Sequence, residues 1–173
     1  MAFQSSDRAL IDMLRISKLT DYATVLLAEL AKQPRWDQRV SASELAEATG
    51  LELPTVAKIL KTLARSRLIE SARGVNGGYC LAMAPEAMPV AAIITAMEGP
   101  IALTECGLEP GLCSRERHCG LRGHWQQIGQ AVEQALTALS LADLARPATT
   151  AHDSALRIKA TIHQDFKQGL ASS

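Results

Sequence analysis

The chain has 173 residues, of which 47% are apolar and only 3% are aromatic. That apolar share supports one ordinary domain with an added element, and the scarcity of aromatic residues disfavours a β-sandwich. Because the formal net charge is zero, any surface that binds nucleic acid must be a local concentration of positive charge. We therefore expect a mainly α fold with a small β-hairpin.

The sequence lacks the marks of a membrane or secreted protein. No stretch reaches the roughly 18 consecutive apolar residues of a membrane-spanning helix, and Asp7, Arg8 and Asp12 interrupt the N-terminus where a signal peptide would be apolar. We expect a cytoplasmic protein with no membrane partner. In that reducing compartment, clustered cysteines are more often metal ligands or redox sensors than disulfides.

Two helices are predicted in the first fifty residues. Apolar side chains recur at helical spacing from Leu19 to Leu30, and the connector after them contains a proline that stops the helix. Ser41 and Glu44 then have the spacing of a capping box at the start of a short second helix. Gly50 ends this helix because glycine adopts a positive φ at little cost.

A third helix follows, with Pro54 at its first position and apolar residues at i, i+3, i+4 and i+7. With the second helix it forms a candidate helix-turn-helix. Its opposite face combines short hydroxyls and long cations, which suit a DNA major groove: Thr55, Lys58, Lys61, Thr62 and Arg65. A solvated helix face is the alternative explanation of this stripe.

Short strand-like runs at 68–72 and 79–82 flank a glycine-rich connection, which predicts a hairpin wing. Arg73 lies at the tip of this wing, where we expect it to contact a narrow minor groove. Cys80 stands alone in the second run. A lone cysteine in a strand usually behaves as a small buried apolar residue, so we do not expect Cys80 to bind metal.

Three cysteines, Cys106, Cys113 and Cys119, lie within fourteen residues of an irregular, glycine-containing segment. Their thiolates are soft ligands that favour iron–sulfur clusters, zinc or Cu(I), although the paired C-x2-C spacing of a zinc ribbon is missing. Three thiolates also leave the coordination of a metal centre incomplete. The candidates for a fourth ligand in this region are His118, His124, Glu105 and Glu109.

A long helix is predicted after the cysteines. Its apolar residues are spaced alternately three and four apart and form a heptad seam: Trp125, Ile128, Val132, Ala135 and Leu139. We expect this seam to form a homodimer, and packing against the chain's own domain is the alternative. From residue 147 onward the chain is polar and rich in Ala, Thr and Ser, so we expect a dispensable tail.

These motifs together resemble a known family. The stretch 14–23 reads LRISKLTDYA, the wing carries RG at 73–74 and GGY at 77–79, and the cysteines precede a tryptophan. Over residues 13–144 the chain resembles the bacterial IscR/NsrR-type family of winged-helix iron–sulfur regulators. The runs PTVAK at 54–58 and EGPIALT at 98–104 are most similar to the branch that regulates the SUF cluster-assembly operon.

The resemblance implies a homodimer in which the three cysteines of each subunit hold an iron–sulfur cluster, with [2Fe-2S] favoured over [4Fe-4S]. Relatives with a histidine as fourth ligand place it three positions after the third cysteine, where this chain has Arg122. Nitric-oxide-sensing relatives use an aspartate from the first helix of the partner subunit, and Asp21 matches that position. Asp21 of the partner subunit therefore ranks ahead of His124 as the fourth ligand.

We expect four regions: an N-terminal extension at 1–12, with Met13 as an alternative start; a winged helix-turn-helix domain at 13–84; a cysteine-loop sensor and dimerisation region at 85–146; and a polar, disorder-prone tail at 147–173. The expected function is an iron–sulfur-cluster-responsive regulator that binds double-stranded operator DNA and represses cluster-assembly genes. An iron–sulfur carrier or scaffold and a zinc- or thiol-based regulator are the alternatives. No catalytic motif is present, so we do not expect an enzyme.

Overall fold

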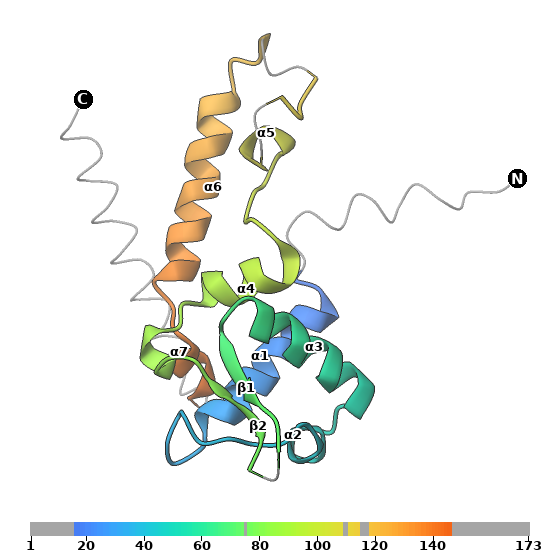
Figure 1. Cartoon of the computed structure of the whole chain (residues 1–173). Helices are drawn as coiled ribbons and strands as arrows, with labels where there is room; N and C mark the ends of the chain where they lie inside the picture. The colour runs from blue at the N-terminus through green and yellow to red at the C-terminus, as the bar shows by residue number, and fades with distance from the viewer. Residues whose placement is uncertain (1–15, 75, 109–110, 115–117, 147–173) are drawn as a thin grey trace, which may run out of the picture.

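The computed structural model describes residues 16–74, 76–108, 111–114 and 118–146, without the side chains of Cys106 and Leu108. A helical body carries a two-stranded hairpin and a long projecting helix (Figure 1). The prediction of a mainly α fold with a small β-hairpin is confirmed, and the predicted extension and tail lie outside the described residues. In chain order the elements are α1 (Lys18–Ala31), α2 (Ala42–Thr49), α3 (Leu53–Arg65), β1 (Ile69–Ala72), β2 (Gly78–Leu81), the 3-10 helix η1 (Pro85–Ala87), α4 (Val90–Glu98), α5 (Glu105–Leu108), α6 (Arg122–Thr137) and α7 (Leu141–Ala145).

Helix α1 lies at the centre of the body. Ser17 caps its start, because the Ser17 hydroxyl accepts a hydrogen bond from the Thr20 amide at 3.3 Å. The apolar residues predicted to face the core are buried: Ala23, Leu26, Leu27 and Leu30. They meet α2, α3, α4, α7 and β2, so elements from distant parts of the chain share one core around α1.

Helices α2 and α3 form the predicted helix-turn-helix. Ser41 and Glu44 make the predicted capping box, and Gly50 ends α2 with a φ of 68°. Helix α3 begins one residue earlier than predicted, so Pro54 occupies its second rather than its first position. Proline is tolerated there, because the first amides of a helix have no intrahelical acceptor.

The wing is anchored to the segment that precedes α2. Strands β1 and β2 pair antiparallel, with Ile69 opposite Leu81 and Ala72 opposite Gly78. On the other side of β2, Val40 and Tyr79 exchange two backbone hydrogen bonds of 2.9 and 2.8 Å. Gly78 has a φ of 139°, and a Cβ on it would lie 2.7 Å from the Val40 carbonyl oxygen. The close approach of these two backbones therefore requires glycine.

The core continues beyond the wing. Met88, Ile93 and Leu141 are fully buried and join the cluster around α1. The chain leaves the body after α4 and returns at α7, where the Val90 amide donates to the Leu139 carbonyl and the Leu141 amide to the Met88 carbonyl, each at 2.8 Å. Buried residues on both sides of residue 84 form one core. The domain boundary predicted at that residue stays a prediction.

Helix α6 stands away from the body and contacts α4 and α5 (Figure 1). None of its residues is buried, and Trp125 and Ile128 are 38% and 45% exposed. The predicted seam follows the helix as far as Ala135, whereas Leu139 lies beyond the end of the helix, beside Val90. The apolar side of α6 is thus open in the single chain. Within the described ranges, no helix combines the length and apolar character needed to cross a membrane.

We predict that Gly78→Ala destabilises the protein by about 1–3 kcal/mol, because the added methyl group collides with the Val40 backbone at a strained φ. Urea unfolding followed by circular dichroism measures this change. Gly120→Ala is the control, because a Cβ there meets nothing within 4 Å and φ lies outside the left-handed range. Equal midpoints for both variants would show that the packing of β2 against Val40 does not constrain the wing.

Candidate nucleic-acid interface and cysteine loop

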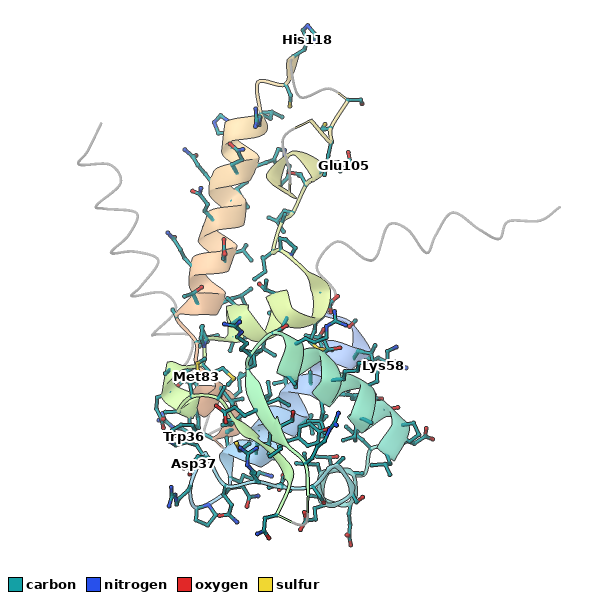
Figure 2. All side chains as sticks on the ribbon, in the orientation of Figure 1. Trp36, Asp37, Lys58, Met83, Glu105 and His118 are labelled. Carbon is teal, nitrogen blue, oxygen red and sulfur yellow. The ribbon has the colours of Figure 1, made fainter. Side chains whose placement is uncertain are left out.

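The outer face of α3 is positively charged. Lys58, Lys61 and Arg65 are exposed and lie on the side opposite the buried face of the helix, which consists of Val56, Ile59, Leu60 and Leu63. No acidic residue occurs between Leu53 and Arg65. The helix therefore presents a cationic surface to solvent, and Figure 2 shows Lys58 projecting outward from it.

The two threonines predicted for the same surface lie at its border. Thr55 and Thr62 are half-buried, and the Thr62 hydroxyl donates to the Lys58 carbonyl at 3.3 Å. That bond occupies the hydroxyl proton while leaving the oxygen as an acceptor. The cations are thus the better-placed groups for phosphate contact, and Thr55 and Thr62 lie at the edge of the cationic surface.

Arg73 is exposed in the connection between the two strands of the wing, as the sequence predicted. The wing is braced by a residue that the sequence analysis missed. Arg39 lies with its guanidinium 3.5 Å from the Gly78 carbonyl oxygen and 3.5 Å from the Glu70 carboxylate. No local pattern indicates this role, because the partners of Arg39 lie far along the chain.

Cys113 and Cys119 are half-buried and form no disulfide, and Cys106 lies on α5 with its side chain outside the description. Figure 1 shows α5 and the adjoining segment beside the far half of α6, away from α3. Among the described side chains no three His, Cys, Asp or Glu residues form a group that could hold a metal ion. Because the Cys106 side chain is not among them, the predicted convergence of the three thiols stays a prediction.

The cysteine-loop segment, residues 105–119, has the donor chemistry that an iron–sulfur cluster requires. It carries three thiols, which become the soft thiolate ligands of such clusters, and two of them are free and accessible in the structure. The residues present therefore fit the cluster that the resemblance implies, with Cys106, Cys113 and Cys119 as the ligands that would hold it.

The candidate fourth ligands lie in different places. His124 is exposed in the first turn of α6, and Glu105 and His118 lie toward the far end of the molecule (Figure 2). Asp21 is exposed in the first turn of α1, within the body. Among the described side chains Asp21 belongs to no group of three potential ligands, and Glu109 lies outside the described residues.

Cys80 has a different environment from the other cysteines. It is only 2% exposed, in β2, and burial raises the pKa of its thiol. Cys80 therefore behaves as a small buried apolar residue, and its exclusion from the metal ligands stays a prediction.

A groove of about 320 Å³ lies between α6 and the segment that leads into the cysteine loop, and α5 itself contacts α6. Ile101, Leu103 and Gly107 line one side of this groove, and Trp125 and Gly129 line the other. The described start of the cysteine loop is therefore joined to α6 through α5.

A helix-turn-helix with a cationic second helix, followed by a hairpin wing, defines a winged-helix DNA-binding protein. Residues 16–147 match the family model described as Rrf2, iron-dependent transcriptional regulator. The chain belongs to the Rrf2 family of DNA-binding transcriptional regulators, a non-enzymatic family.

Individual relatives agree with this membership. The chain is 30% identical over 145 residues to protein rrf2 of Nitratidesulfovibrio vulgaris, covering 84% of this chain and 96% of the relative. It is 31% identical over 132 residues to the regulator NsrR of Halalkalibacterium halodurans, covering 76% and 90%. The solved structure of CymR, the global cysteine regulator of B. subtilis, has 30% sequence identity and a TM-score of 0.58, covering 76% of this chain and 96% of that one.

We predict that Arg65→Ala weakens binding to random-sequence duplex DNA and reduces the slope of log affinity against log salt by about 1, because one phosphate contact is lost. Fluorescence anisotropy at several salt concentrations measures both quantities. Arg35→Ala is the matched control, because Arg35 is an exposed cation paired with Asp37 in the α1–α2 connector. An unchanged salt slope for Arg65→Ala would exclude Arg65 from the phosphate contacts.

Proposed function

We propose that this protein is an iron–sulfur-cluster-responsive transcriptional repressor. The observation that carries the proposal is the position of the cysteine loop, which lies against α6 at one end of the molecule while the cationic face of α3 lies in the body at the other. Membership of a DNA-binding regulator family favours this function over an iron–sulfur carrier or scaffold.

The proposed active form is a homodimer. The apolar side of α6, with Trp125 and Ile128 exposed, supports pairing with a second copy. Two subunits would then place two α3 helices in successive major grooves of an operator, with Lys58, Lys61 and Arg65 on groove edges and phosphates and Arg73 in a flanking minor groove. Such a complex represses by covering the promoter.

A cluster held by the three cysteines would make the conformation of the loop depend on iron and redox state. The loop contacts α6 through α5, and α6 contacts α4, which packs on α1. Rearrangement of the loop would therefore change the spacing of the two recognition helices. A coupling free energy of about 1–3 kcal/mol would alter operator affinity roughly 5- to 150-fold.

Asp21 of the partner subunit is the proposed fourth ligand. In its own chain Asp21 is exposed at the start of α1, in the body, whereas α5 lies beside the far half of α6 (Figure 1), and this supports its availability to a second subunit. We further propose that the target genes assemble iron–sulfur clusters, because the chain resembles the SUF branch in its PTVAK and EGPIALT runs. A cytoplasmic location belongs to the same proposal, since it keeps the thiols reduced.

A second candidate is a regulator that uses the thiols without iron. The similarity to Staphylococcus aureus CymR, for which an oxidized form has been solved, favours this candidate, in which zinc or thiol oxidation replaces the cluster.

Anaerobic purification separates the two candidates. We expect coloured protein with iron and acid-labile sulfide, and a change in affinity for promoter fragments of cluster-assembly genes when the cluster is removed by a chelator. Colourless, iron-free protein that binds the same fragments with unchanged affinity would leave the thiol- or zinc-based regulator as the better explanation.

Cysteine substitutions test the ligand set. Cys106→Ala, Cys113→Ala and Cys119→Ala are each expected to abolish the visible absorption band and the bound iron, because the site loses a thiolate. Cys80→Ala is the control and should retain both, since Cys80 is buried in β2. If the Cys80 variant loses iron while the other three retain it, the assignment of the ligands is wrong.

The fourth ligand is tested by comparing Asp21→Ala with His124→Ala. We expect Asp21→Ala to shift the visible and circular dichroism spectra of the cluster and His124→Ala to leave them unchanged. The reverse result would assign the ligand to His124, within the same subunit as the cysteines.

A further inference from the structure

The start of α1 is held by a carboxylate from another helix. Glu98, the last residue of α4, accepts a hydrogen bond from the Ser17 amide at 2.9 Å and a second from the Thr20 hydroxyl through the same oxygen, Oε1. These contacts join residues that are 81 and 78 positions apart in the sequence. They hold the pKa of the Glu98 carboxyl below its ordinary value, with the Thr20 hydroxyl as the larger cause and the Ser17 amide next.

The contacts form a closed network. The Ser17 hydroxyl accepts from the Thr20 amide, and the two hydroxyl oxygens lie 3.1 Å apart. Because Thr20 donates its only hydroxyl proton to Glu98, the Ser17 hydroxyl donates to Thr20. Thr20 is 1% exposed and is the one buried polar side chain among the described residues. The first turn of α1 is therefore fixed in position by Glu98, and its buried hydroxyl is satisfied.

This network joins α1, which carries the proposed ligand Asp21, to the end of α4, which leads into the cysteine loop. On one side, Asp21 directly follows Thr20, and its amide makes the first helical bond of α1 to the Ser17 carbonyl at 3.0 Å. On the other side, Glu98 ends α4, and the chain turns at Gly99, with a φ of 95°, into the segment that leads to Cys106. One carboxylate thus connects the stem of a subunit's own cysteine loop to the turn that presents Asp21.

We propose that Glu98 is a positioning residue for the cluster: it fixes the first turn of α1 so that Asp21 is presented to the partner subunit's cysteine loop. This inference rests on the proposed function, in which Asp21 completes the partner's site. It also connects the two sites of a dimer, because each Glu98 adjoins the stem of one loop and orients the ligand of the other.

A double-mutant cycle tests the proposal on full-length protein reconstituted anaerobically with iron and sulfide. Glu98→Ala is expected to speed the loss of visible absorption in a chelator about tenfold, the low end for groups that orient a metal ligand. Asp21→Ala is expected to speed this loss by at least the same factor. The double variant should be no faster than Asp21→Ala alone, because Glu98 acts through Asp21.

Two comparisons separate positioning from general stability. Glu98→Gln keeps an oxygen acceptor for the Ser17 amide and the Thr20 hydroxyl, so it should restore most of the wild-type rate. Glu86→Ala removes an exposed carboxylate from η1 and should behave as wild type. In the apo protein, Glu98→Ala should speed hydrogen exchange at the Ser17 amide, which loses its acceptor, while exchange at the buried residues of α1 stays unchanged.

The outcomes are distinguishable. If Glu98→Ala retains the cluster as wild type does while Asp21→Ala loses it, the role of Glu98 is wrong and the proposed function stands. Effects that multiply in the double variant would also overturn the proposal, because Glu98 would then act independently of Asp21. If Asp21→Ala is indistinguishable from wild type, both the proposed fourth ligand and its positioning by Glu98 are wrong.

Discussion

Leu26, Leu27 and Leu30 of α1 are buried against elements that come from both halves of the described chain. Each such leucine contributes about 1.5–3 kcal/mol through burial, so these side chains are a large part of what keeps the body folded. Helices α2 and α3 contact α1, and so do α4 and α7. The helix-turn-helix and the helices that flank the cysteine loop are consequently parts of one packed unit, and neither can move freely while α1 stays fixed.

This shared core gives the proposed switch its physical basis. Interiors are close-packed, so a displacement of α4 would be passed on to α1 and α3, both of which α4 contacts. The contact between Glu98 and the first turn of α1 adds a polar connection at the same junction. The proposed switch needs no large domain motion, because small shifts of α1 would change the angle at which α3 is presented to DNA.

Much of the body could be predicted from sequence because its signals are local. The capping box at Ser41 and Glu44, the glycine after α2 and the apolar spacing of α3 each specify a helix boundary or a buried face within a few residues. The position of α7 was not predictable in this way. Its five residues are too short for a periodic pattern, and it folds because Leu141 returns to the core formed by α1.

Residue types and spacing predict the three cysteines as ligands, and that assignment stays a prediction. The burial of Cys80 in β2 agrees with the tendency of a lone cysteine in a strand to be buried. The roles of Arg39 and Glu98 depend on partners brought together only by the tertiary fold, so no sequence pattern marks them. Leu139 lies outside the helix that carries the predicted seam. Its backbone carbonyl accepts a hydrogen bond from the distant Val90 amide, a contact that no local pattern indicates.

The pairing of Val90 with Leu139 closes a loop that contains α4, the cysteine loop and α6. The two ends of this loop are fixed by backbone hydrogen bonds in the body, and each doubling of a flexible loop's length costs only about 0.6 kcal/mol in closure entropy. Insertions and deletions within the cysteine loop should therefore cost the folded body little stability. Evolution can then change the spacing and number of ligands in this segment, and so the signal that is detected, while the DNA-binding surface is inherited unchanged.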